Sequence, residues 1–100
     1  MLDQALSVYK QAITINPDDA KAHYNIGRVY LVKGMRDPAL RSLSAEHYYR
    51  AGVLFHEQGN TDWALMAYNS LKKAKSEELE QALSEKLKPE LQQRENKASK

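Results

Sequence analysis

The chain has 100 residues, a formal net charge of +2 and no cysteine. This length allows one small domain with a single modest core, and the lack of cysteine excludes disulfides and a cysteine-ligated metal. So small a positive excess does not indicate a nucleic-acid partner, and no apolar run approaches membrane-spanning length. Because alanine, leucine, lysine, glutamate and glutamine dominate while glycine and proline are sparse, the composition favours an all-helical chain.

The N-terminal segment MLDQALSVYK carries an acid and no long apolar block, so it does not resemble a signal peptide. The absence of cysteine also fits a reducing compartment. We therefore expect a cytoplasmic location.

The first two predicted helices are separated by a proline. Residues 3–15 place apolar side chains at helical spacing. Pro17 ends this helix, because proline disfavours the α conformation in the residue before it. Asp18 or Asp19 then caps a second helix over residues 20–33 by accepting hydrogen bonds from free backbone N–H groups.

A third helix follows a short turn. Gly34 fits the end of the second helix, where we expect a residue in the left-handed conformation. Asp37 and Pro38 then supply a cap followed by a first-turn proline. The helix that begins here reaches the turn QGNTD at residues 58–62.

The C-terminal third contains two more predicted helices. Thr61 or Asp62 caps a helix over residues 63–75. Serine and two glutamates begin a last helix favourably, because acids lie at its positive end. This last helix covers residues 76–91, and residues 92–100, which have no apolar face, are expected to form a flexible tail.

The most specific signal is an internal repeat. In the segments HYNIGRVYLVKG and YYRAGVLFHEQG, histidine or tyrosine precedes an apolar–glycine pair at the same spacing. An aromatic residue, a second glycine and then an alanine follow the first glycine at matching distances. This pattern resembles the tetratricopeptide (TPR) family, whose helix–turn–helix unit has about 34 residues.

The resemblance implies an all-α fold of TPR-like helix–turn–helix repeats, an α-solenoid fragment, with a C-terminal capping helix. It divides the chain into a TPR-like helical domain at residues 1–91 and the flexible tail at residues 92–100. The domain's expected parts are, in chain order, the second half of a repeat (1–17), a shortened repeat (20–44), a repeat (45–75) and the capping helix (76–91).

The small residues of the pattern have a packing role. Gly27 and Gly52 let the two helices of a hairpin approach closely, since a side chain at either position would wedge them apart. Ala39 and Ala64 are expected to be the small partners on the facing helix. Such a hairpin cannot bury its apolar faces alone, so neighbouring units must supply the rest of the core.

One junction departs from the family's spacing. The glycine of the first hairpin recurs nine residues earlier than a regular array requires. At about 100° per residue, the apolar positions from Ala39 to Phe55 form one continuous stripe. We therefore predict one continuous helix at residues 37–58; the alternative is that Ser44 caps a separate helix.

A helix of this length predicts an unusual assembly. The hairpins at its two ends would lack the usual stacking between them, and their bare faces would need another chain. One functional hypothesis is therefore structural self-association through the long helix 37–58, by helix sharing or domain swapping, into a homodimer or higher oligomer.

The other hypothesis follows from the resemblance, because TPR arrays bind peptides along a concave groove lined by their first helices. It implies a non-catalytic protein–protein interaction scaffold for a protein or peptide partner. The candidate partner-binding residues are Lys21, Tyr24, Asn25, Arg28, Leu31, Tyr49, Arg50, Val53 and His56. For Tyr49 and Val53, packing against a neighbouring helix is the alternative.

Some TPR domains clamp a terminal carboxylate with lysine, asparagine and arginine at fixed positions. Asn25 and Arg50 match two of these positions. Glu46 stands where the clamp needs lysine, so the resemblance does not extend to that ligand.

No feature indicates an enzyme, a cofactor or a metal site. His23 and His47 lie on apolar stripes, where a buried histidine is more common than a ligand, and no histidine pair has i,i+4 spacing. No glycine-rich phosphate loop is present. Lys72, Lys73 and Lys75 fit favourable placement at a helix C-terminus. We expect no nucleic-acid and no membrane partner.

Overall fold

The computed structural model describes the backbone of residues 2–98 and the side chains of residues 2–93. This part of the chain forms six α-helices and no strand. In chain order they are α1 (Leu2–Ile15), α2 (Ala20–Lys33), α3 (Pro38–Glu57), α4 (Thr61–Lys73), α5 (Glu77–Lys86) and α6 (Lys88–Ala98). The prediction of an all-α fold built from helical hairpins is confirmed.

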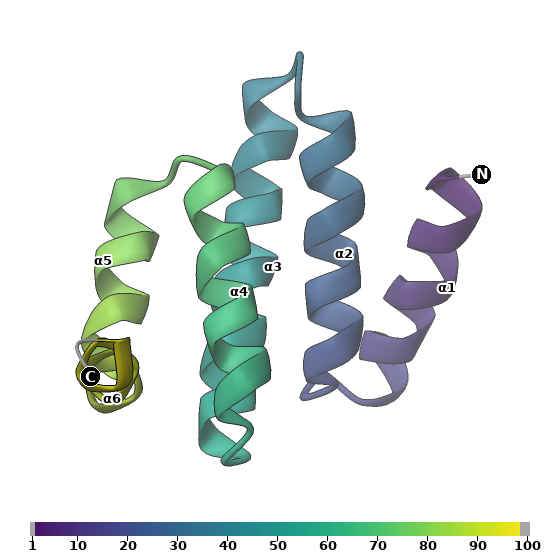
Figure 1. Cartoon of the computed structure of the whole chain (residues 1–100). Helices are drawn as coiled ribbons and strands as arrows, with labels where there is room; N and C mark the ends of the chain where they lie inside the picture. The colour runs from purple at the N-terminus through teal and green to yellow at the C-terminus, as the bar shows by residue number, and fades with distance from the viewer. Residues whose placement is uncertain (1, 99–100) are drawn as a thin grey trace.

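Helices α1 to α5 run alternately down and up, and α6, seen end-on below α5, turns away from their direction (Figure 1). α3 is the centre of the arrangement, because it packs against α2, α4 and α5. α1 packs on α2 and so forms one edge of the molecule, while α5 and α6 form the other (Figure 1).

The long helix predicted from the shortened junction is confirmed, since α3 is continuous over 20 residues. Its start is fixed by Asp37, whose carboxylate accepts a 3.0 Å hydrogen bond from the Ala39 N–H, and by Pro38 in the first turn. Ser44 is buried and does not cap a new helix. Its hydroxyl donates a 2.7 Å hydrogen bond to the Gly27 carbonyl, which ties the middle of α3 to α2.

The neighbouring helix starts are set by polar residues. Asp19 caps α2, with its carboxylate accepting a 3.0 Å hydrogen bond from the Ala22 N–H. The cap predicted for α4 is wrong by one or two positions. Asn60 occupies that place and makes no side-chain cap hydrogen bond, so Thr61 and Asp62 lie within the first turn.

Gly34 ends α2 as predicted, but not in the left-handed conformation that was expected. This residue has φ −84° and is not left-handed. A Cβ at this position would lie 2.6 Å from the backbone nitrogen of Arg41. Glycine is needed here because α2 and α3 approach each other closely at the turn.

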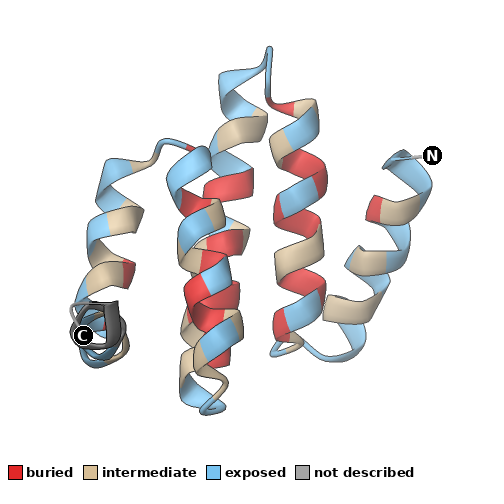
Figure 2. Ribbon diagram, viewed as in Figure 1, coloured by how far each residue is buried: buried red, intermediate tan, exposed pale blue. Residues whose placement is uncertain are grey.

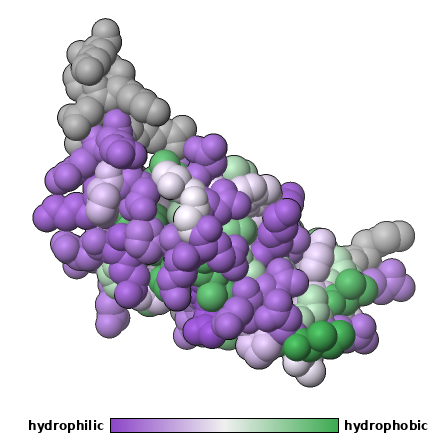
Figure 3. All heavy atoms as spheres, turned by 90° about the horizontal axis from the view of Figure 1, so that it is seen from below, coloured by the Kyte–Doolittle hydropathy of each residue, from purple (hydrophilic) through white to green (hydrophobic). Residues whose placement is uncertain are grey.

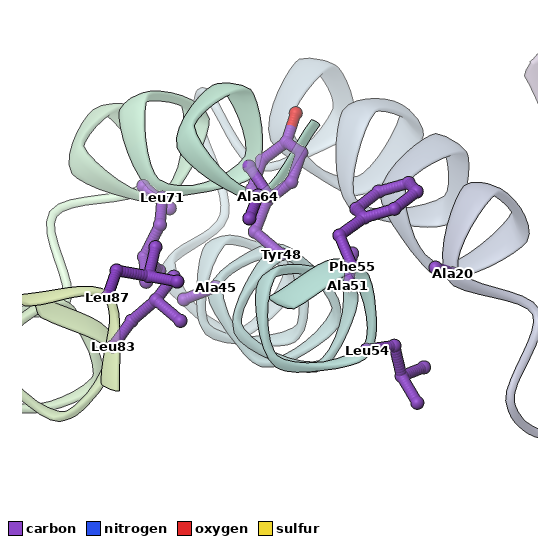
Figure 4. Close-up of a cluster of buried hydrophobic side chains, with 12 residues drawn as sticks. Ala20, Ala45, Tyr48, Ala51, Leu54, Phe55, Ala64, Leu71, Leu83 and Leu87 are labelled. Atoms are coloured by element: carbon purple, nitrogen blue, oxygen red, sulfur yellow. The ribbon is translucent and has the colours of Figure 1, made fainter. Parts of the chain in front are cut away.

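The main core surrounds α3. The Tyr48 ring points from α3 into the space between α2 and α4 (Figure 4). Leu71, Leu83 and Leu87 meet where α4 and the C-terminal helices approach α3 (Figure 4). Buried positions accordingly gather on the facing sides of α2, α3 and α4 (Figure 2).

A second, smaller cluster joins α1 to α2. Its buried members are Leu6, Ile26, Val29 and Tyr30. The opposite side of α1 is exposed (Figure 2). α1 is therefore anchored by one face only.

The hairpins were predicted to lack the usual stacking between them, but side chains of α2 and α4 are in contact. Tyr24 of α2 meets Trp63 of α4 edge-on, with ring centroids 5.9 Å apart. The Tyr24 hydroxyl also makes a 3.0 Å hydrogen bond with the Ser70 hydroxyl of α4. α2 and α4 both pack along α3, so the long helix brings the two hairpins together instead of separating them.

The small residues of the repeat behave only partly as predicted. A Cβ on Gly27 would lie 2.8 Å from the Tyr48 ring, so this glycine does allow the hairpin to close. A Cβ on Gly52 would instead lie 2.7 Å from Leu83, which belongs to α5 and not to the hairpin partner α4. Ala39 is exposed in the first turn of α3 and is no small partner for α2.

The capping helix predicted at residues 76–91 is two helices, α5 and α6, and most of the tail predicted at residues 92–100 belongs to α6. The chain is helical through Ala98, and residues 99–100 lie outside the described range. Pro89 stands in the first turn of α6, where its missing N–H leaves no hydrogen bond unmade. The residues that follow are mostly good helix formers. Leu91 is half-buried against the main core and helps to hold the helix there.

One backbone conformation leads to a stability prediction. Lys75, between α4 and α5, has φ 56°, in the left-handed region that favours glycine. We expect Lys75→Gly to stabilise the chain by about 0.5 kcal/mol in urea unfolding, because the relief of strain exceeds the added freedom of the unfolded chain. Lys73→Gly, at the end of α4, is the control and should destabilise the chain. A lower unfolding midpoint for Lys75→Gly would contradict this account.

Candidate functional site

Two adjoining hollows follow the uncovered side of α2. The larger has a volume of about 390 Å³ and is bounded by α1, α2 and α4, with Tyr48 of α3 among its lining residues. The smaller, of about 350 Å³, lies between α2 and α4. Because they share α2 residues, we treat them as one surface, the α2 groove. Its principal lining residues are Lys21, Tyr24, Asn25, Arg28, Leu31, Trp63, Met66, Ser70 and Lys73.

Helical spacing explains why one side of α2 supplies so much of this surface. Tyr24 and Asn25 lie three and four residues after Lys21, and Arg28 lies four and three residues after them, which places all four on one face. The other faces of α2 are occupied by α1 and α3. The chain thus leaves a polar and aromatic face of a well-anchored helix uncovered.

Aromatic side chains define the middle of the groove. Tyr24 packs against Tyr48, with ring centroids 5.4 Å apart, and also contacts Trp63. Burial raises the pKa of Tyr48 to about 12, and the nearby Tyr24 hydroxyl adds to this effect. Both causes disfavour the phenolate, so Tyr48 is a neutral part of the surface at physiological pH.

Cationic side chains lie beside these rings. The Lys21 Nζ lies 5.5 Å from the centroid of the Trp63 ring. Arg28 and Lys73 are exposed at the groove. Their ammonium and guanidinium groups are therefore open to a ligand.

The structure separates the predicted partner-binding residues into two groups. The five on α2 line the groove: Lys21, Tyr24, Asn25, Arg28 and Leu31. The four on α3 do not line it: Tyr49, Arg50, Val53 and His56. The second half of α3 is shared among α2, α4 and α5, so it does not continue the α2 surface.

The contacts of the α3 group show where they lie instead. Tyr49 and Val53 are half-buried against the main core. The His56 Nδ1 lies 2.8 Å from a carboxylate oxygen of Glu90 in α6. The Arg50 guanidinium lies 3.6 Å from Asp18, in the turn between α1 and α2. Since Arg50 and Asn25 lie on different surfaces, no carboxylate clamp is assembled from them.

The residues that α4 contributes to the groove were not predicted from the sequence. Trp63, Met66, Ser70 and Lys73 line the groove, although only first helices of the repeats were expected to do so. Their intervals of three and four residues place them on one helical face. That spacing, together with the polar residues among them, is the signal that could have identified this wall of the groove.

The two histidines predicted to be buried form a stacked pair between α2 and α3. Their ring centroids are 5.3 Å apart and their Nδ1 atoms 3.1 Å apart. The His23 Nε2 donates to the Pro17 carbonyl at 2.8 Å, so in the neutral pair the Nδ1 of His23 accepts from the Nδ1–H of His47. No group of three potential metal ligands occurs among the described residues.

This pair gives a pH prediction. Burial, with smaller contributions from the charges of His23 and Lys10, lowers the pKa of His47 from 6.5 to about 4. The unfolded chain therefore binds more protons than the folded chain between these values, so stability rises with pH across this window and then levels off. Allowing for partial exposure, we expect a contribution on the order of 1 kcal/mol.

Urea unfolding at about pH 4.5 and pH 7 measures this contribution. His47→Gln should reduce the difference in unfolding free energy between the two pH values by that amount. His56→Gln, outside the pair, serves as the comparison. The same pH difference in His47→Gln as in the parent chain would contradict the prediction.

The helices formed by the described residues include none that is both long enough and apolar enough to cross a membrane. Antiparallel hairpins stacked along a shared helix, with a groove beside one of them, define a helical-repeat protein.

Comparison with known families identifies the repeat. A family model described as TPR repeat matches residues 2–34, which span α1, the following turn and α2. The TPR resemblance is thus confirmed over these residues, and the chain is an all-α protein of TPR-like helical hairpins. TPR repeats are in general protein-interaction scaffolds. No curated protein and no solved structure matches the chain.

Proposed function

We propose that the chain is a non-catalytic scaffold that holds a segment of a protein partner in the α2 groove. The observation that carries this proposal is the groove itself, whose central helix lies within the TPR match. It combines half-buried aromatic rings with hydrogen-bonding groups such as Asn25 and Ser70. Aromatic anchors with polar groups at their edges are typical of surfaces that bind peptides.

The chemistry of the groove supports binding over catalysis. Among the described residues that line it there is no histidine and no carboxylate to act as a general base. The Ser70 hydroxyl is engaged with the Tyr24 hydroxyl. A nucleophile without a base beside it is not activated.

The test uses a display library of random peptides of about twelve residues, selected on the immobilised full chain. Trp63 is the chain's one tryptophan and lines the groove, so its fluorescence reports occupancy directly. We expect selected peptides to change this fluorescence. Tyr24→Ala should weaken their binding about tenfold or more, because it removes a central aromatic anchor.

Tyr68→Ala is the matched control. Tyr68 is also a half-buried tyrosine that packs against the main core, but it does not line the groove. We expect its loss to leave peptide affinity unchanged. Peptides that leave the Trp63 fluorescence unchanged and tolerate Tyr24→Ala would contradict the proposal.

Self-association remains a second candidate, resting on the outer face of α1. Val8 and Ile15 on this helix are 62% and 86% exposed. In the view from below, hydrophobic atoms gather on the side where α1 lies (Figure 3). By contrast, α3 is packed against three other helices, which leaves it less surface to share.

Light scattering on a sizing column at two protein concentrations tests this second candidate. A mass that stays near 11.4 kDa would exclude self-association at those concentrations. A larger mass that returns to the monomer value in Val8→Asp would support α1 as the contact.

A further inference from the structure

The charges along the α2 groove are of one sign. Lys21, Arg28 and Lys73 line its two hollows, and no aspartate or glutamate is among the described residues that do so. The ion pairs formed by described residues involve other cations, namely Lys33, Arg50 and His56. With a net charge of only +2, the chain concentrates unpaired positive charge at this surface.

Apolar surface lies between these charges. Met66, which is 46% exposed, lies with Trp63 and Tyr24 along the smaller hollow. Leu2 and Val32, which are 41% and 53% exposed, line the larger one. A ligand can therefore bury large apolar side chains while its charged groups meet the cations at the rim.

We infer that the α2 groove selects an acidic segment of a protein partner, one that places a large apolar side chain beside Tyr24, Trp63 and Met66. This inference rests on the proposed function and adds the chemistry of the partner. Its carboxylates would pair with Lys21, Arg28 and Lys73, which the fold has left without partners of its own.

The side chains favour a peptide over a single-stranded nucleic acid, which would also meet positive charge. The Lys21 ammonium group lies over the Trp63 ring, on which a base would otherwise stack. Leu2, Val32 and Met66 add aliphatic surface, which suits apolar side chains better than bases. A nucleic-acid surface is also expected to carry more charge than this chain offers.

The experiment compares two peptide pools of equal length, about ten residues, on the full chain. Both contain leucine and phenylalanine at the same positions. The remaining positions are aspartate or glutamate in one pool and lysine or arginine in the other. We expect the acidic pool to bind and change Trp63 fluorescence, with affinity that falls as salt concentration rises.

Charge reversal locates the effect. Arg28→Glu and Lys21→Glu should each weaken binding of the acidic pool about fivefold to tenfold. Lys72→Glu is the matched control, because Lys72 neighbours Lys73 in sequence but its Nζ lies 4.7 Å from the Tyr68 ring, outside the groove. All three positions are exposed, and thermal unfolding checks that the fold is kept.

Each outcome has one meaning. The basic pool could bind better than the acidic pool, change the Trp63 fluorescence and lose its binding in Tyr24→Ala. This result would overturn the acidic preference but leave the proposed function standing. Binding of neither pool would contradict both. Displacement of the acidic pool by a thymidine oligonucleotide of about ten nucleotides at similar concentration would also overturn the inference, in favour of a polyanion site.

Discussion

Leu83→Ala should lower the free energy of unfolding by about 2–5 kcal/mol, the range for deleting a fully buried leucine side chain. Leu83 is 0% exposed and belongs to the main core, although it stands on the short C-terminal helix α5. Its methyl groups pack against Gly52 of α3. The substitution would leave a cavity where α5 meets the centre of the molecule.

Urea unfolding followed by circular dichroism measures this loss. Leu43→Ala is the matched control, because it deletes the same atoms at a site that is 37% exposed, and it should cost less than about 1 kcal/mol. Equal losses in the free energy of unfolding for the two variants would mean that α5 is not part of the cooperative core.

Gly27→Leu should lower the free energy of unfolding by about 3 kcal/mol, and Gly27→Ala should lower it by about 1–2 kcal/mol. These losses are expected even though both replacements have a better helix propensity than glycine. The new Cβ would lie 2.8 Å from the ring of Tyr48, which is 1% exposed and held between α2 and α4. The atom that the new Cβ would meet belongs to an aromatic ring and is not the end of a flexible side chain, so either the ring or α2 must shift.

Gly52→Ala provides the contrast. Its new Cβ meets the ends of the Leu83 side chain, which can rotate, so strain and helix propensity should nearly cancel, leaving a change below about 1 kcal/mol. Tyr48→Leu should recover part of the cost in the Gly27→Ala background, because residues in contact are not additive. A Gly27→Ala variant as stable as the parent chain would contradict the close approach of α2 and α3.

The first four helices and the continuity of α3 could be predicted because both depend on local signals. Pro17, Asp37 and Pro38 mark helix ends through backbone chemistry that acts within a few residues. The apolar stripe of α3 is likewise a property of one helix. The local pattern also explains why α6 was not predicted as a separate helix, because α6 is amphipathic only at its start.

Contacts between distant segments could not be predicted in the same way. The pairing of Gly52 with Leu83, and of Tyr24 with Ser70, depends on how the hairpins turn relative to each other. The repeat pattern supplied that geometry by resemblance, and the shortened junction removes the regular spacing on which it relies. For this reason the predicted α2 residues do line one groove, whereas the predicted α3 residues lie elsewhere. The α4 residues that complete the groove were not predicted.

The continuous α3 also changes how the repeat behaves as a thermodynamic unit. Repeat arrays can unfold from one end, because each unit contacts only its neighbours and the junctions are weak points. Here one helix belongs to both hairpins, and Ser44 joins its middle to the Gly27 carbonyl. Unfolding therefore cannot stop between the two hairpins, because no break in the helix separates them. A ligand bound in the α2 groove would raise the stability of α4 and α5 as well, by the same binding free energy.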